Sequence, residues 1–475
     1  MPNKYIRKFI RYAVILLSFG IGFIMLVVDC PREGYEWYGV VPILFAIMTL
    51  LCGSFSFCEY KKIGVFVLQL SMICRYVITP IIGHFGGYHS IFGTSVTKKE
   101  IEMAVLLTVY EMIFVFVISE YQSRMWKHKV CGIINKSGGE NRIEPLRGSI
   151  FHIGIILLGI AAVIFQPLTI SDQRFLFNQN NLALNIRVDF PLAGIYKTAF
   201  NFARYSVILL VINLCFKRNK KHRSIENIVL PILVIAVNAL FNSNLSRIGL
   251  LVPIITFSVV MLRVFSEKKQ RRTLMLIVGC GLIGGLIFLS FVKFFGEGRG
   301  DTSNSTDLSW WSDTLNMYFM GIKEIALGVK ATSRVEAVYG WFRLPLIFND
   351  IFSQVVGLSN FTNTDINSTT LYNLTYFGSS ISKSQICPNI CEGLYYFGGF
   401  FAPLWTGVFV WLTHWFTNRI SEQKYIDSMF VYTISAVYCG MCLMINSCMI
   451  IYAIVNISLL YGVIAYLNKK IVLRR

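Results

Sequence analysis

Long apolar runs dominate the chain, separated by short polar and basic stretches. A helix that crosses a bilayer needs about 20 mostly apolar residues, and lipid offers the backbone no hydrogen-bonding partner, so helix is the expected state of each run. Twelve runs are candidates for spans. They are residues 12–28, 40–57, 63–82, 101–118, 150–168, 192–215, 226–241, 248–265, 274–294, 397–416, 427–445 and 448–466.

Residues 295–396 form the one long connection, and connections of this length are usually functional or disordered. Its apolar positions at alternating four- and three-residue steps predict an amphipathic helix, which either packs on its neighbours in the loop or lies in the outer leaflet. Residues 335–358 carry Glu336, Arg343 and Asp350, so we expect a helix pair at the membrane surface or partly re-entering it, not a full span. The stripe positions are Trp311, Leu315, Tyr318, Ile322, Ile325 and Val329.

The expected fold class is therefore an all-α polytopic membrane protein, with about twelve transmembrane helices and one large external loop containing amphipathic helices. Three parts follow. Residues 1–294 would hold the first nine spans, residues 295–396 the extracytoplasmic loop, and residues 397–475 the last three spans and a cytoplasmic C-terminus.

Composition agrees with the span pattern. The chain has 475 residues, of which 55% are hydrophobic and 15% charged, whereas soluble domains carry about 25% charged residues. The net charge of +19 indicates cytoplasmic anchoring and not nucleic-acid binding. With the N-terminus inside, 27 of the 44 Lys and Arg fall in cytoplasmic segments and 12 in external ones, which places both termini in the cytoplasm.

Arginine is the natural ligand for phosphate and pyrophosphate, because its planar fork donates paired hydrogen bonds and keeps its charge. Arg247 opens a span after a short polar turn, where it either binds a ligand or snorkels to the interface. Arg299 lies among glycines that would let the backbone approach a ligand or simply form a flexible exit. Arg174 and Arg187 bracket a polar external loop, which suits a phosphate or sugar site and a solvated loop equally.

Other basic residues lie in the external loop or inside predicted spans. Arg334 and Arg343 belong to the loop. Inside a membrane, Arg75 and Arg204 are costly and are expected to face a cavity or a partner. Arg204 lies deepest in its predicted span, so it is either functional or part of a structural ion pair.

Glu392 is the acidic residue next to the tenth predicted span. One interpretation is a helix start, where the dipole favours a carboxylate. The other is a carboxylate that faces a catalytic cavity and accepts a proton from a sugar hydroxyl. Cys387 and Cys391 lie beside it, but the spacing lacks a second pair or a nearby His, so no metal site is predicted.

Three features resemble the Wzy-type polymerases of bacterial O-antigen and capsular polysaccharide. They are the start of a span in SNLSRIGLL, the large external loop after closely spaced spans, and the segment ICPNICEGLYYFGGFFAPLWTG that closes the loop. The resemblance implies a membrane glycosyltransferase in the plasma membrane of a bacterium. It would join oligosaccharide repeat units carried on undecaprenyl diphosphate, with a chain-length regulator and a flippase as further partners.

In such an enzyme, Arg247 and Arg299 would bind the diphosphate, with Arg174 and Arg187 as second candidates. Glu392 would be the base or would orient the acceptor. Arg204, Arg334 and Arg343 complete the expected substrate-binding set. Neither a metal nor a cofactor is expected, because arginines can neutralise the leaving group.

Two alternatives stay open at this point. An O-antigen ligase-like glycosyltransferase shares the chemistry and passes the glycan to another acceptor. A flippase or transporter of lipid-linked oligosaccharides fits twelve spans but would not need the loop of about a hundred residues.

Overall fold

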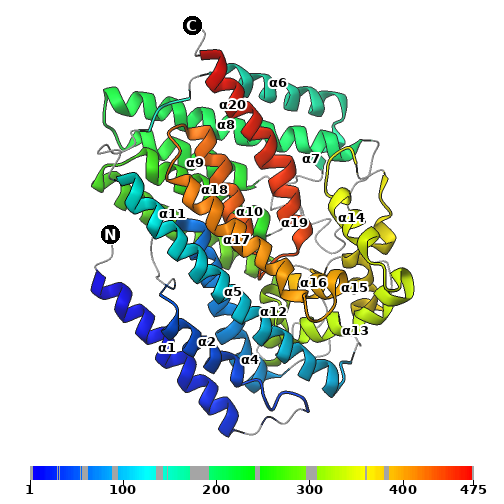
Figure 1. Ribbon diagram of the computed structural model, residues 1–475. Helices are drawn as coiled ribbons and strands as arrows, with labels where there is room; N and C mark the ends of the chain where they lie inside the picture. Colours follow the sequence, from blue (N-terminus) through cyan, green and yellow to red (C-terminus); the bar gives the residue numbers. More distant parts are fainter. Residues whose placement is uncertain are drawn as a thin grey trace. The chain divides into compact units, whose positions relative to one another are not determined.

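The computed structural model describes residues 4–472, apart from residues 29, 31–32, 54, 56–61, 88–94, 135–142, 147, 172–191, 241–246, 296–307, 359–360 and 379–384. In this part of the chain every regular element is helical (Figure 1). The β contact found there is an isolated bridge between Glu144 and Tyr425. The expected all-α class is confirmed.

The chain divides into two compact units. Unit 1 comprises residues 1–138, 303–418 and 438–452, and unit 2 comprises residues 139–302, 419–437 and 453–475. The division does not follow the three consecutive parts expected from the loop, because residues 303–396 belong to the same unit as the first helices.

Unit 1 is built from the N-terminal helices, the helices of the long connection and part of the last ones. Its elements are α1 (Lys4–Val27), α2 (Val40–Leu51), α3 (Ile63–Ile73), the π-helical segment η2 (Cys74–Ile78), α4 (Thr79–Gly86), α5 (Lys98–Ile134), α12 (Leu308–Phe319), α13 (Ile322–Tyr339), α14 (Leu344–Ser353), the 3₁₀ turn η7 (Thr364–Ile366), α15 (Ser368–Phe377), α16 (Asn389–Phe397), most of α17 (Ala402–Ile420) and α19 (Ser447–Tyr452).

Unit 2 is built around the pair α6 and α8. Its elements are α6 (Ile150–Phe165), α7 (Leu168–Ser171), α8 (Ala193–Lys221), α9 (Glu226–Leu240), α10 (Arg247–Val264), α11 (Lys268–Phe295), most of α18 (Ile426–Gly440), the π-helical segment η8 (Ala453–Leu459) and α20 (Leu460–Val472).

Five helical stretches in the described residues are long and apolar enough to cross a membrane. This supports the membrane character expected from composition. Shorter apolar helices of 10–17 residues occupy further predicted spans, such as Val40–Leu51 and Ile150–Phe165, so the count of twelve stays a prediction. The five stretches are Tyr5–Val27, Ile63–Gly86, Lys98–Trp126, Ala193–Lys221 and Ser447–Asn468.

The long connection is helical from α12 to α16. The single amphipathic helix expected there is interrupted after Phe319, where Met320 has a positive φ of 50° and Gly321 precedes α13. On α12 the polar side chains of Ser312 and Asn316 are buried, whereas Trp311 is 46% exposed. On α12 the expected apolar stripe therefore does not pack inward: the buried face is polar, and on it Asn316 donates to the Ser312 carbonyl (2.8 Å).

The expected helix pair in residues 335–358 corresponds to the end of α13 and to α14. Gly340 follows α13 with a φ of 59°, and Pro345 lies in the first turn of α14. A positive φ strains any residue with a Cβ, so the glycine allows the break.

The long connection packs on the first helices of unit 1 through α13, which contacts α5, α15 and α16. Gly328 lets α13 and α16 pack closely, because a Cβ there would collide with the Cys391 side chain. Gly398 ends α16 with a φ of 77° and separates it from α17. The predicted tenth span therefore begins with the end of a short separate helix.

Candidate functional site

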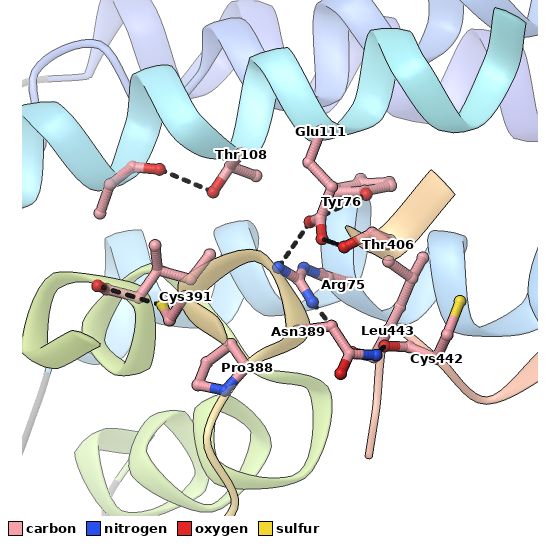
Figure 2. Close-up of polar contacts among 12 residues, drawn as sticks. Arg75, Tyr76, Thr108, Glu111, Pro388, Asn389, Cys391, Thr406, Cys442 and Leu443 are labelled. Carbon is pink, nitrogen blue, oxygen red and sulfur yellow. Dashed lines mark hydrogen bonds and ion pairs between the residues drawn. The ribbon is translucent and has the colours of Figure 1, made fainter. Parts of the chain in front are cut away.

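The core of unit 1 holds a buried ion pair between two predicted spans. Arg75 Nη2 lies 2.6 Å from Glu111 Oε2, and both side chains are almost fully buried (Figure 2). Arg75 Nη1 also donates to the Leu443 carbonyl at 3.0 Å. A charge in an apolar interior is costly unless it is paired and hydrogen-bonded, and here Glu111 supplies the counter-charge and the Leu443 carbonyl a hydrogen bond.

Local backbone structure presents Arg75 to its partner. Arg75 lies in η2, where the helix widens to a π-helical turn between α3 and α4. The Thr79 hydroxyl donates to the Cys74 carbonyl at 2.8 Å and so satisfies a carbonyl at the end of that turn. Single π-helical turns are often found at functional sites.

Glu111 has two further neighbours. The Thr406 hydroxyl donates to Glu111 Oε1 at 2.8 Å, and the Tyr76 hydroxyl lies 3.5 Å from Oε2 (Figure 2). Elements far apart in the sequence, namely η2, α5, α17 and the turn at Leu443, are thereby tied together at one polar cluster.

The start of α16 also contacts the turn at residues 441–446. Asn389 donates its amide to the Cys442 carbonyl at 2.6 Å (Figure 2). Its Oδ1 is buried and has no hydrogen-bond partner among the described residues. An acceptor of this kind can bind a hydroxyl or amide donor from a ligand.

Glu392 lies one turn after Asn389 and is fully buried. Its Oε2 accepts from the Ser447 backbone N–H (3.0 Å) and from Trp405 Nε1 (3.4 Å). Its Oε1 is buried and has no partner within the described part of the chain. Burial is the main reason that the pKa of Glu392 is raised to about 8, and the Ser447 hydrogen bond opposes the shift.

Unit 1 holds two more buried carboxyl groups, one on α13 and one on α14. Glu324 Oε2 on α13 accepts from the Tyr372 hydroxyl (2.5 Å) and from Gln385 Nε2 (3.1 Å). Burial raises the pKa of Glu324 to about 7. Its Oε1 has no partner among the residues described.

Asp350 on α14 is held at both oxygens. Oδ1 accepts from the Ser368 N–H at 3.0 Å, and Oδ2 accepts from the Tyr396 hydroxyl at 2.6 Å. Burial raises the pKa of Asp350 to about 6. The negative charges of Asp350 and Glu392 also oppose each other, which contributes to the raised pKa of Glu392.

Unit 1 thus holds three buried carboxyls with pKa values close to neutrality: Glu324, Asp350 and Glu392. Such groups can hold or accept a proton near neutral pH. Glu392 and Glu324 differ from Asp350 because each keeps one oxygen without a partner in the described structure.

Arg343, one of the predicted substrate-binding arginines, contacts the helix that carries Glu392. Its Nη1 donates to the carbonyls of Leu394 and Tyr395, both at 3.1 Å, at the end of the helix that carries Glu392. Its Nη2 pairs with Glu336 at 3.0 Å. Arg343 therefore caps α16, and as a substrate-binding residue it stays a prediction.

Two further predicted arginines, Arg334 and Arg204, have surroundings of their own. Arg334 is exposed on α13. Arg204 belongs to unit 2, where it donates to Asn238 Oδ1 (2.7 Å), to the Asn238 carbonyl (2.6 Å) and to Asn201 Oδ1 (3.2 Å). The bonds to Asn201 and Asn238 give Arg204 a structural role in joining α8 to α9.

The side chains of four predicted arginines lie outside the described part of the chain. Arg174, Arg187 and Arg299 lie outside the described residues. Arg247 begins α10, but its side chain is outside the described part. The arginine half of the expected site therefore stays a prediction.

Sequence reasoning named Arg75 but missed its partner Glu111, and it also missed Glu324 and Asn389. A signal for Glu111 exists, because it is a lone acidic residue inside an apolar run and such residues are expected to be paired. Glu324 and Asn389 carry no comparable signal, since both lie in the long connection, outside the apolar runs that predict spans.

No group of three or more His, Cys, Asp or Glu side chains in the described residues is arranged to hold a metal ion. Cys387 and Cys391 are free and buried, and the Cys391 thiol lies 3.7 Å from the Ile325 carbonyl. Compared with known proteins, the chain matches no family model, no curated protein and no solved structure.

Proposed function

We propose that this chain is a membrane glycosyltransferase that polymerises oligosaccharide repeat units carried on undecaprenyl diphosphate, at the external face of a bacterial plasma membrane. The observation that supports it best is the Glu392 carboxyl. One oxygen is fixed by Ser447 and Trp405, and the other is free to accept a hydrogen bond from a ligand hydroxyl.

In the proposed reaction, the hydroxyl of the acceptor sugar attacks the anomeric carbon of the donor glycan. The new glycosidic bond forms as the bond from that carbon to the diphosphate oxygen breaks. The hydroxyl proton passes to Glu392 Oε1, and undecaprenyl diphosphate leaves with the bonding electrons. Arg247 and Arg299, with Arg174 and Arg187, are the proposed ligands of the diphosphate, because arginine neutralises a developing phosphate charge.

The proposal requires α16 to open toward the substrate, because Glu392 has no exposed surface. Gly398, between α16 and α17, is a suitable hinge position, since its φ of 77° is accessible chiefly to glycine. Asn389 would then offer its free Oδ1 to a second hydroxyl of the acceptor.

The test uses a strain in which this chain is deleted and then restored as wild type, Glu392→Gln, Arg247→Ala or Arg299→Ala. The lipid-linked and surface polysaccharides are separated on a gel. We expect the deletion and the three variants, at normal protein level, to accumulate single repeat units on the carrier. Asp365→Asn is the matched control, because Asp365 is an exposed carboxylate of the same segment.

Other outcomes identify the alternatives. Long glycan chains that stay on the lipid carrier in the deletion strain would favour the ligase-like enzyme. Repeat units confined to the cytoplasmic face would favour a flippase. Normal polymer in the deletion strain would remove the proposed function altogether.

A further inference from the structure

Unit 2 contains a surface groove of about 700 Å³ at the junctions between α8 and α9 and between α10 and α11. Its wall combines charged and polar side chains with one apolar strip. The lining residues are Arg223, Ser224, Ile225, Glu226, Val229, Leu230, Leu233, Glu267, Lys269 and Gln270.

The segments that carry the rim of the groove are basic. The charged residues that line the groove are Arg223, Lys269, Glu226 and Glu267. Residues 217–226 and 266–272, to which all four belong, contain nine Lys and Arg against two Glu. One of these acids orients a rim arginine, because Glu267 Oε1 lies 2.7 Å from Arg223 Nη1. The other, Glu226, lies 3.9 Å from Arg218, so the remaining charge of the rim favours an anion.

The floor of the groove is apolar and continues along α9. Val229, Leu230 and Leu233 line the groove, and Val237 follows one turn later on the same face. All four are exposed, and Leu233 is 56% exposed. A groove with a basic rim and an exposed apolar floor matches a molecule with an anionic head and a hydrocarbon tail.

Buried amides fix the shape of the groove. Gln270 is 4% exposed and donates to Asn219 Oδ1 at 3.0 Å, which ties α11 to α8. Asn227 is 2% exposed and donates to the His222 carbonyl at 2.9 Å, which ties α9 to the end of α8. The wall between rim and floor is therefore preformed.

The groove also lies where a membrane surface is expected. α8 is one of the five helices that can span a membrane, and its last turn contains Arg218, Lys220 and Lys221. A basic cluster at the end of a span lies at the headgroup level and attracts anionic lipids.

We propose that this groove binds one anionic phospholipid, with the phosphate at Arg223 and Lys269 and an acyl chain along Val229, Leu230 and Leu233. The inference does not depend on the proposed function, because it uses only residues of unit 2 that the glycosyl transfer does not involve.

The test is a lipid titration of the detergent-solubilised full chain, followed by native mass spectrometry. We expect the wild type to bind phosphatidylglycerol more tightly than phosphatidylcholine. The double variant Arg223→Gln, Lys269→Gln is expected to raise the dissociation constant for phosphatidylglycerol about 30-fold, since each basic residue near an anionic lipid contributes about a fivefold gain in affinity. Leu233→Asn is expected to weaken binding of both lipids.

Two matched controls accompany these variants. Lys424→Gln with Lys470→Gln removes the same charge from unit 2 outside the groove, and Leu157→Asn alters an exposed leucine of α6. If the wild type bound phosphatidylglycerol and phosphatidylcholine with equal affinity, that result alone would overturn the proposal. Losses of affinity in the control variants equal to those in the groove variants would also overturn it. Glycerol 3-phosphate binding as tightly as phosphatidylglycerol would overturn it too, because the site would then take a free phosphate.

Discussion

At the scale of single residues, Glu392 combines burial with one free carboxylate oxygen. A base must be deprotonated to accept a proton, and burial raises the pKa of Glu392 to about 8. We therefore expect the rate of glycan extension by the purified protein to rise with pH up to about 8 and then to level off.

The measurement is the pH profile of Glu392→Gln beside that of wild type. The amide keeps the shape and cannot take the proton, so the variant is expected to show a low rate without the rise. Rescue of part of the rate by Glu392→Asp would support the carboxyl chemistry. A pH profile for Glu392→Gln that matches wild type would contradict it.

The ion pair between Arg75 and Glu111 is the second residue-scale feature. Glu111→Gln leaves a buried guanidinium without its counter-charge, so we expect the free energy of unfolding to fall by about 3–5 kcal/mol. Replacing both residues with Leu is expected to recover much of that loss, because no charge is then left unpaired.

Denaturant unfolding in detergent measures how much this ion pair stabilises the protein, and Arg124→Gln is the control. Arg124 is exposed and pairs with Glu120 on the same helix, so its loss is expected to leave the unfolding midpoint unchanged. If Glu111→Gln were as stable as the control, the pair would not hold unit 1 together.

At the scale of elements, the contact of α13 with α16 depends on Gly328. A methyl group there meets the Cys391 side chain, so Gly328→Ala is expected to lower the free energy of unfolding by about 1–3 kcal/mol. Adding Cys391→Ala is expected to restore part of the loss. Gly154→Ala in α6 is the control: it meets nothing within 4 Å and replaces glycine inside a helix, so its stability is expected to stay equal or to rise.

At the scale of the whole molecule, the distribution of Lys and Arg predicts which segments are external. Ser305, in the predicted external loop and outside the described residues, is the position to test. We expect a membrane-impermeant maleimide to label Ser305→Cys in intact cells and to label Lys221→Cys only after permeabilisation. Labelling in the reverse order would overturn the orientation and the proposed site of polymerisation with it.

Much of the architecture was readable from the chain. Lipid offers the backbone no hydrogen-bonding partner, so apolar runs form helices, and the all-α class was predicted. A helix pair was predicted within residues 335–358, and Arg75 was expected to face a cavity or a partner, of which the structure shows the partner, Glu111. The break at Met320 and the buried polar face of α12 were not predicted, because periodicity reports which face is apolar and not what the neighbouring helix offers.

The sequence by itself determined that this is a helical, lipid-compatible chain with ionisable residues at costly positions, because hydropathy and length depend only on local composition. Tertiary structure alone decided which of these residues meet. Glu111 pairs with Arg75, Ser447 holds Glu392, and Tyr372 holds Glu324. Such partners lie far apart in the sequence, and only packing decides which buried polar groups meet and which oxygen is left free.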